Sequence, residues 1–191
     1  MIYTHTDASR PFSYTSTAIT LHWFMALALA ANFVLGLTMN DLPLSPQKLQ
    51  FFSWHKWTGI TLLGLVTLRL IWRGLASPPT LLSAPLWQRR TARYTHLLLY
   101  VLMFAIPMSG WLMSSAGGFT VNYLGVLPLP DLVSKNKALF NQLKDVHETL
   151  NFSLLAVVVL HILAALKHHF IDHDTTLARM LPWLNRRAIR K

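Results

Sequence analysis

The stretch VHETLNFSLLAVVVLHILAALKHHF, residues 146–170, decides the fold of this 191-residue chain. It is long and apolar enough to form an α-helix that crosses a bilayer, which takes about 20 residues. Two histidines, His147 and His161, lie inside this apolar run. A polar side chain within a spanning helix is costly and usually functional, so the stretch predicts both a membrane span and a buried site.

Three further stretches have the same length and apolar character, at 16–39, 52–72 and 92–113. Proline-rich turns separate them, including Pro78 and Pro79, and runs so continuously apolar are helical. We predict an all-α membrane protein: one four-transmembrane-helix bundle that forms a single domain over 1–191. The first apolar run continues past Ala28 and Ala30, so we expect it to be retained as a span and not cleaved as a signal peptide. The longest connection is expected to hold a short surface helix near 131–143.

The composition excludes several classes of protein. Only 13% of residues are charged and 53% are hydrophobic, against about 25% charged residues in a typical soluble domain. Disorder is excluded because it requires low hydrophobicity. The net charge of +10 is typical of nucleic-acid binders, but here the basic residues lie between apolar runs, as in a membrane protein. We therefore expect the lipid bilayer, and no nucleic acid, as a partner.

The basic residues also predict the orientation in the membrane. The side that holds the two termini and the second connection has twelve of them: Arg10, Arg69, Arg73, Arg89, Arg90, Arg93, Lys167, Arg179, Arg186, Arg187, Arg190 and Lys191. The opposite side has five: Lys48, Lys56, Lys135, Lys137 and Lys144. Because basic loops stay inside, both termini are expected in the cytoplasm.

The chain has no cysteine, which excludes disulfides, Cys-ligated iron–sulfur clusters and covalently attached c-type haem. Histidine remains as the metal ligand. His147 and His161 are 14 residues apart, so they share one helix face at depths about 21 Å apart. The predicted topology places His55 at the depth of His147, near the outer surface, and His22 at the depth of His161. Two pairs of imidazoles between the helices are what two b-type haems require.

Other interpretations of these histidines remain. A single intramembrane histidine is often a polar group hydrogen-bonded to a neighbouring helix. A haem-free metal transporter would also use histidines, but it usually adds carboxylate or sulfur ligands, and Glu148 is the only span-associated glutamate. His96 either replaces His22 as the inner ligand or lies at a helix end near the headgroups. Arg69 either pairs with a haem propionate or extends to the headgroups.

Pro107 and Gly110 interrupt the third apolar stretch. They predict either a kink in that helix or close packing against a neighbouring one.

Taken together, these residues resemble the bacterial cytochrome b561 family over nearly the whole chain. The matching pieces, in order, are His22–Trp23, Trp54–His55–Lys56, Thr58–Gly59, Arg69–Leu70–Ile71–Trp72–Arg73, His96, Tyr100, Pro107–Met108–Ser109–Gly110, His147–Glu148–Thr149–Leu150, His161, Lys167–His168–His169–Phe170–Ile171–Asp172, Asp174, Thr176–Leu177 and Arg179–Met180–Leu181–Pro182. Residues 114–145 match least. The resemblance implies an inner-membrane cytochrome with two haem b groups bound by histidines of the first, second and fourth helices.

The resemblance also implies electron transfer between the periplasmic face and the quinone pool. Some members act as superoxide oxidases that pass the electron to ubiquinone, and others are electron-transfer subunits for a periplasmic or cytoplasmic protein partner. For superoxide, Lys56, Lys48 and Lys135 are candidates to steer the anion to the outer haem, or are ordinary solvated charges. For ubiquinone, His168 and His169, with Asp172, are candidates to bind and protonate the headgroup, or are simply the polar end of the fourth helix.

Overall fold

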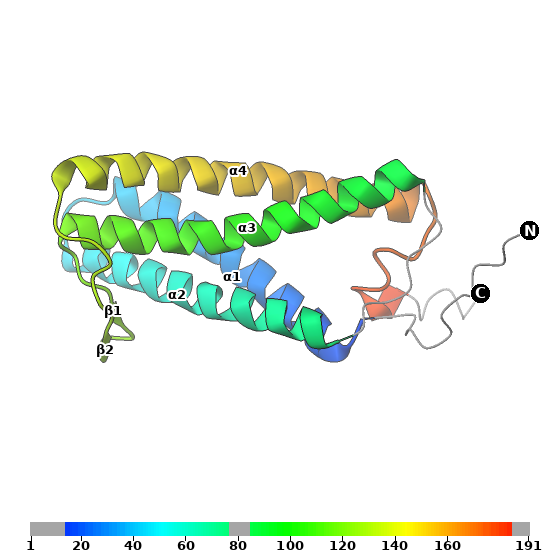
Figure 1. The fold of residues 1–191 in the computed structure, drawn as a ribbon, viewed down its shortest axis with the longest axis horizontal. Coiled ribbons are helices and arrows are strands. Elements are labelled where there is room, and N and C mark those ends of the chain that lie inside the picture. Colours follow the sequence, from blue (N-terminus) through cyan, green and yellow to red (C-terminus); the bar gives the residue numbers. More distant parts are fainter. Residues whose placement is uncertain (1–13, 77–84, 185–191) are drawn as a thin grey trace, which may run out of the picture.

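The computed structural model describes residues 14–76 and 85–184 and is a bundle of four long helices (Figure 1). They are α1 (Ser16–Asp41), α2 (Pro46–Leu75), α3 (Leu86–Gly117) and α4 (Lys137–Phe170). Each of the four predicted spans lies within one helix, so the predicted all-α, four-helix fold is confirmed. Arg10 and the basic residues from Arg186 onward, on which part of the orientation prediction rests, lie outside the described residues, as do Pro78 and Pro79 of the predicted turn.

All four helices are long and apolar enough to cross a membrane. Little of each span is buried within the bundle, and many of its large apolar side chains, such as Leu27, Leu160 and Leu163, face outward. Such an apolar outer surface suits lipid and not water. The chain is therefore a multi-pass membrane protein.

Local sequence explains where the helices begin and end. The side-chain oxygens of Thr15, Ser45 and Asn136 accept hydrogen bonds from backbone N–H groups in the first turns of α1, α2 and α4. Pro46 occupies the first turn of α2, where its missing N–H costs nothing. Gly118 ends α3 with a φ of 74°, a left-handed conformation that favours glycine.

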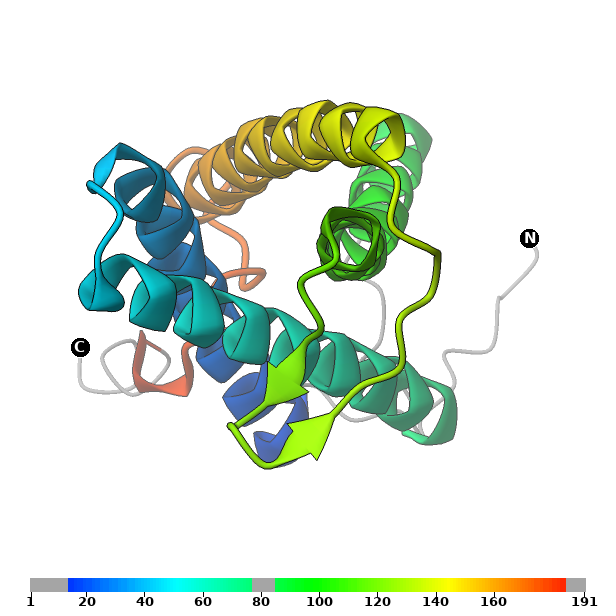
Figure 2. The same cartoon turned by 90° about the vertical axis from the view of Figure 1, so that its left-hand side faces the viewer.

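The connection between α3 and α4 differs from the sequence-based expectation. A two-stranded antiparallel hairpin, β1 (Asn122–Tyr123) and β2 (Leu127–Pro128), lies over α2 (Figure 2). The short surface helix expected near 131–143 is wrong: 131–136 is not helical, and the later residues form the first turns of α4. The side chain of Asn136 caps the first turn of α4, and this cap fixes the start of the helix at Lys137.

Indole and hydroxyl groups on α2 hold the hairpin in place. Trp57 Nε1 donates to the Asn122 carbonyl at 2.7 Å, and the Thr61 and Tyr123 hydroxyls lie 2.9 Å apart.

We call the end of the bundle that carries this hairpin the hairpin end. The opposite end, where α1 begins and α4 finishes, is the terminal end; there Trp23 Nε1 donates to the Met180 carbonyl at 2.9 Å and holds the segment after α4 against α1.

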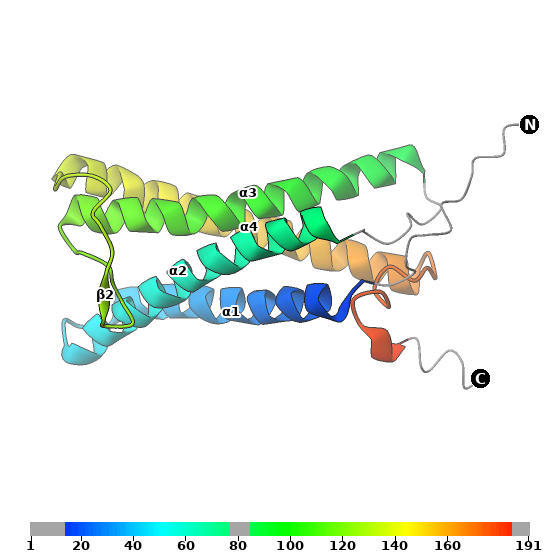
Figure 3. The same ribbon diagram turned by 60° about the horizontal axis from the view of Figure 1, so that its bottom comes forward.

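The helices pack as α1 with α2, α2 with α3 and α3 with α4, with the α1–α2 pair lying beside the α3–α4 pair (Figure 3). Two small apolar clusters form the core. Met25, Leu62 and Val66 join α1 to α2, and Leu102, Ile106 and Leu154 join α3 to α4. The α3 helix continues without a break through Pro107. This packing brings the inward-facing polar residues of different helices to common depths.

Candidate cofactor site

His55 on α2 and His147 on α4 face each other towards the hairpin end. Their ring centres are 6.2 Å apart and the ring planes are nearly perpendicular, at 81°. These residues are 92 positions apart in the sequence, and the bundle alone brings them together. The pair occupies the depth at which the sequence placed the outer site.

The outward nitrogen of each ring is held by a backbone carbonyl. His55 Nδ1 lies 3.2 Å from the Asn32 carbonyl oxygen on α1, and His147 Nδ1 lies 3.1 Å from that of Ile106 on α3. A carbonyl only accepts, so Nδ1 carries the proton in both rings and the lone pair is on Nε2. Hydrogen bonding of the second ring nitrogen in this way is typical of metal-binding histidines.

At the deeper level, towards the terminal end, three imidazoles lie together. The ring centres of His22 on α1 and His161 on α4 are 6.4 Å apart, and those of His96 on α3 and His161 are 5.4 Å apart. The expectation that His96 lies at a helix end is wrong, because α3 begins at Leu86, well before the predicted span.

These distances can be tested against the size of a haem iron. With metal–nitrogen bonds of about 2 Å, and ring nitrogens about 1.2 Å from the ring centre, two imidazoles on opposite sides of one iron have centres about 6.3 Å apart. The 6.2 Å and 6.4 Å pairs fit this separation, and the 5.4 Å pair is too close. Each of these two pairs offers two imidazoles at one depth, a donor set that suits the iron of a b-type haem.

Arginine and tyrosine side chains accompany the deeper histidines. Arg69 Nε donates to the Tyr100 hydroxyl at 3.2 Å, and the Arg73 guanidinium lies 5.8 Å from the centre of the Tyr100 ring. The two guanidinium groups beside Tyr100 at this depth would favour an anionic group bound there.

The three lysines predicted to steer an anion have different surroundings. Lys48 Nζ donates to the carbonyls of Asn40 and Leu42 at 3.0 Å and 2.6 Å and so caps the end of α1. Lys56 Nζ lies 3.5 Å from the Phe119 carbonyl and 5.8 Å from the centre of its ring.

The stem of Lys135 passes over Gly118, in the turn next to Phe119. Lys56 and Lys135 thus both lie at this turn on the hairpin end, whereas the ammonium group of Lys48 is hydrogen-bonded to the end of α1.

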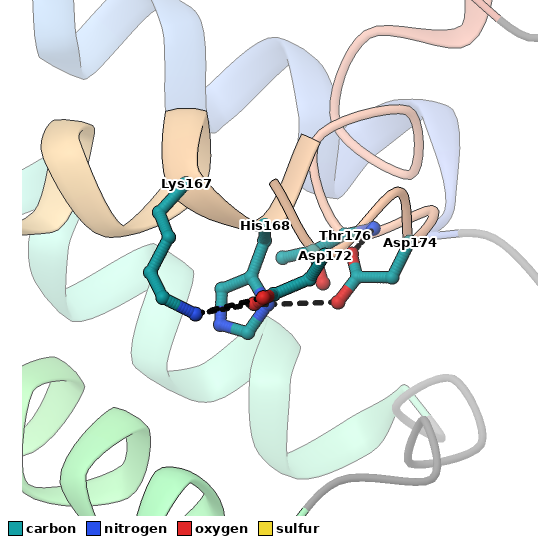
Figure 4. A network of polar contacts seen from close by, with 5 residues as sticks. All are labelled: Lys167, His168, Asp172, Asp174 and Thr176. Carbon is teal, nitrogen blue, oxygen red and sulfur yellow. Dashed lines mark hydrogen bonds and ion pairs between the residues drawn. The ribbon is translucent and has the colours of Figure 1, made fainter. Parts of the chain in front are cut away.

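His168, at the end of α4, is the centre of a polar network (Figure 4). Its Nδ1 lies 2.8 Å from Asp174 Oδ2 and 3.1 Å from Asp172 Oδ2, and Lys167 Nζ lies 2.6 Å from the same Asp172 oxygen. The backbone N–H of Thr176 donates to Asp174. These contacts use Nδ1, and among residues 14–76 and 85–184 none is recorded at His168 Nε2.

His169, which the sequence grouped with His168, takes a different position. Its ring stacks edge-on against Phe170, with centres 4.8 Å apart. The structure thus joins His168 to Asp172 and gives His169 an apolar neighbour.

The groups that hold the outer imidazoles were not predictable from residue types and spacing. Asn32 and Ile106 act through their backbone carbonyls, and Ser109, only 6% exposed, places its hydroxyl 2.9 Å from His147 Nδ1. The available signals were Ser109 and Gly110 inside an apolar span, and of these only Gly110 had been interpreted, as a sign of a kink or of close packing. Backbone carbonyls leave no signal in a sequence.

Comparison with known proteins assigns the chain to a family. Residues 13–183 match the family model described as prokaryotic cytochrome b561. Two curated relatives from Escherichia coli K12 are cytochrome b561 homolog 2, 35% identical over 90% of this chain and 92% of the relative, and cytochrome b561 homolog 1, 30% identical over 88% and 97%. A third, the probable superoxide oxidase CybB of Yersinia pestis, is 30% identical over 88% of this chain and 96% of the relative.

The match covers all four helices and both imidazole pairs. The chain belongs to the prokaryotic cytochrome b561 family of membrane electron-transfer proteins, which bind b-type haem.

Proposed function

We propose that this chain is a two-haem b cytochrome that oxidises superoxide at the hairpin end and reduces ubiquinone at the terminal end. The observation that carries the proposal is that two imidazole pairs lie at two depths of the bundle. The ring centres are 6.2 Å apart in one pair and 6.4 Å apart in the other. His55 and His147 hold the iron of the outer haem, and His22 and His161 hold that of the inner haem. Bound haem supplies a one-electron carrier at each depth.

The choice of His22 over His96 rests on distance. An iron between His96 and His161 would need their ring centres about 1 Å further apart than 5.4 Å. His22, at 6.4 Å, already has the required separation. His96 then lies beside the inner pair as a polar neighbour.

The electron balance of the proposed reaction is simple. Each superoxide loses one electron and leaves as dioxygen, and no proton is needed for this step. Two such electrons and two protons convert one ubiquinone to ubiquinol. The chain's task at the hairpin end is therefore to attract an anion, and at the terminal end to bind a headgroup and deliver protons.

At the hairpin end, Lys56 and Lys135 supply the positive charge. Both lie by the turn at Phe119, and Lys56 directly follows His55. A positive approach raises the rate of anion encounter by about 10-fold or more at low salt. Lys48 adds to the same field, but its hydrogen bonds to the end of α1 hold it in place.

At the terminal end, Arg69 would pair with a propionate of the inner haem, since its guanidinium lies with that of Arg73 beside Tyr100. His168 Nε2 is the proposed proton donor to the quinone headgroup, with Asp172 and Asp174 holding Nδ1–H. His169 and Phe170 supply a mixed polar and apolar surface beside it.

The proposed location is the bacterial inner membrane, with both termini in the cytoplasm and the hairpin in the periplasm. The basic residues at the terminal end, among them Arg69, Arg73, Arg89 and Arg90, support this orientation by the positive-inside rule. Superoxide would then be oxidised in the periplasm, and the quinone would be reduced from the cytoplasmic leaflet.

A second function is an electron-transfer subunit that serves a periplasmic redox protein. The observation that favours it is the hairpin tip, where Leu124 and Val126 are 55% and 80% exposed. An exposed apolar tip suits docking of a protein partner. In that case the same haems would receive electrons from the partner and not from superoxide.

The experiment that separates the two is rapid mixing of the purified oxidised protein with superoxide, followed by ubiquinone. If the protein is a superoxide oxidase, superoxide should change the haem absorption spectrum to that of the reduced form. Ubiquinone added afterwards should restore the spectrum of the oxidised form. Superoxide that disappears no faster than it does without protein, with the haems staying oxidised, would contradict the proposal and favour the subunit.

A further inference from the structure

Two glycines stand against the outer imidazoles in the same geometry. A Cβ added to Gly36 on α1 would lie 3.1 Å from His55 Cε1, and one added to Gly110 on α3 would lie 3.1 Å from His147 Cε1. Contacts this short between carbon atoms require one group to move. A side chain at either position would therefore displace the imidazole by a few tenths of an ångström.

Each glycine is also four residues after the carbonyl that holds the ring. Asn32 accepts from His55 Nδ1 and precedes Gly36 by four, and Ile106 accepts from His147 Nδ1 and precedes Gly110 by four. Because Cα–Cβ bonds tilt towards the start of a helix, the side chain at position i+4 overhangs the carbonyl at position i. Glycine at i+4 leaves that carbonyl open to a second donor.

We propose that Gly36 and Gly110 are positioning residues that form two equivalent seats for the outer haem ligands. In each seat, the glycine leaves a helix carbonyl uncovered, and that carbonyl accepts the Nδ1–H of the facing histidine. The ring is thereby oriented with Nε2 towards the outer haem iron. The first seat uses α1 to hold a ring from α2, and the second uses α3 to hold a ring from α4. This inference rests on the proposed assignment of His55 and His147 as ligands.

The second seat has an additional member. The Ser109 hydroxyl donates to the Ile106 carbonyl at 2.7 Å and lies 2.9 Å from His147 Nδ1, so it accepts part of the Nδ1–H bond. Acceptors on Nδ1–H make the imidazole a stronger electron donor to a bound metal. A stronger donor favours the oxidised iron and lowers the reduction potential, so Ser109 is expected to lower the potential of the outer haem.

The inference is tested in the purified full-length protein by measuring the ratio of haem to protein and the reduction potentials. Gly110→Ala and Gly36→Ala are compared with Gly64→Ala on α2, where a new Cβ has no neighbour within 4 Å. All three changes replace glycine by alanine within a helix and raise its helix propensity similarly, so a difference between them comes from the seat. We expect each seat variant either to fall from two haems to one or to raise one potential, with Gly64→Ala unchanged.

Ser109→Ala is the second variant, and it alters the seat without adding bulk. We expect it to keep two haems and to raise one of the two potentials. Unchanged potentials in Ser109→Ala would remove Ser109 from the seat. If Gly110→Ala does not accumulate, Gly36→Ala with the haem content and both potentials of the wild type overturns the proposal.

His147→Ala separates this inference from the proposed function. If that variant keeps both haems, the ligand assignment itself is wrong. If it loses one haem while Gly36→Ala and Gly110→Ala match the wild type in haem content and in both potentials, only the seats are wrong.

Discussion

The histidines of this chain differ in what holds their Nδ1 atoms. His55 and His147 donate to backbone carbonyls, which leaves Nε2 for a metal, whereas His168 donates to two carboxylates at the surface. Spacing along α4 predicted the depths of its histidines, because a helix has a fixed rise per residue. It could not predict the groups around each ring, because they come from other helices or from the segment after α4.

Replacing His168 with Gln tests its proposed role as proton donor to the quinone. We expect quinone reduction to slow about 10-fold or more, because general acid catalysis commonly contributes that much, while the haem spectra stay unchanged. His169→Gln is the comparison, since that ring contacts Phe170 and not the carboxylates. Undiminished quinone reduction in His168→Gln would remove the residue from the mechanism.

The lysines at the hairpin end can be separated in the same way. We expect Lys56→Gln with Lys135→Gln to slow the reaction with superoxide several-fold at low salt and to flatten its salt dependence. Lys48→Gln should instead lower the stability of the protein by about 0.5–1 kcal/mol, because Lys48 caps the C-terminal carbonyls of α1. Stopped-flow rates over a range of salt concentrations would check this, and equal rates in the double variant and the wild type would argue against steering.

At the level of elements, hydropathy predicted four helices but misplaced their ends and missed the hairpin. The helices extend beyond the apolar runs because polar caps such as Asn136 and Ser45, and not the membrane boundary, decide where they begin. The hairpin has only two residues in each strand and is fixed by Trp57 and Thr61 on α2. A strand pair this short leaves no periodic pattern in the sequence.

The segment after α4 gives a prediction about pH. Burial raises the pKa of the Asp174 carboxyl, but hydrogen bonds from Thr176 and the contact with His168 outweigh it, and the net pKa is lowered. A carboxyl whose pKa is lowered by folding stabilises the fold above its unfolded pKa of about 3.9, and this contribution is lost as the pH falls through the folded value. The contact of Asp174 therefore holds the segment at neutral pH and releases it only in acid.

Asp174→Asn should remove this stabilisation at neutral pH. Because the side chain is about a quarter exposed, we expect the loss to be no more than about 1 kcal/mol, seen as faster hydrogen exchange at the Thr176 amide. The difference between variant and wild type should shrink below about pH 4. Equal protection of Thr176 in the two proteins at pH 7 would be evidence against this account.

At the scale of the whole molecule, four tilted helices bring residues from distant parts of the sequence to two depths. The fold class was predictable because long apolar runs have few alternatives in a membrane. The imidazole pairing needed one more step, the alternation of sides, which assigns a depth to each histidine. The sequence left two positions open for His96, the deeper level or a helix end, because α3 begins earlier than its apolar run.

The haem content of the purified protein tests the central claim most directly. The pyridine haemochrome spectrum, set against protein concentration, should give two b haems per chain in the wild type, and one in either His147→Ala or His22→Ala. Fewer than two haems in the wild type, or two haems retained in either variant, would contradict the assignment of one imidazole pair to each haem.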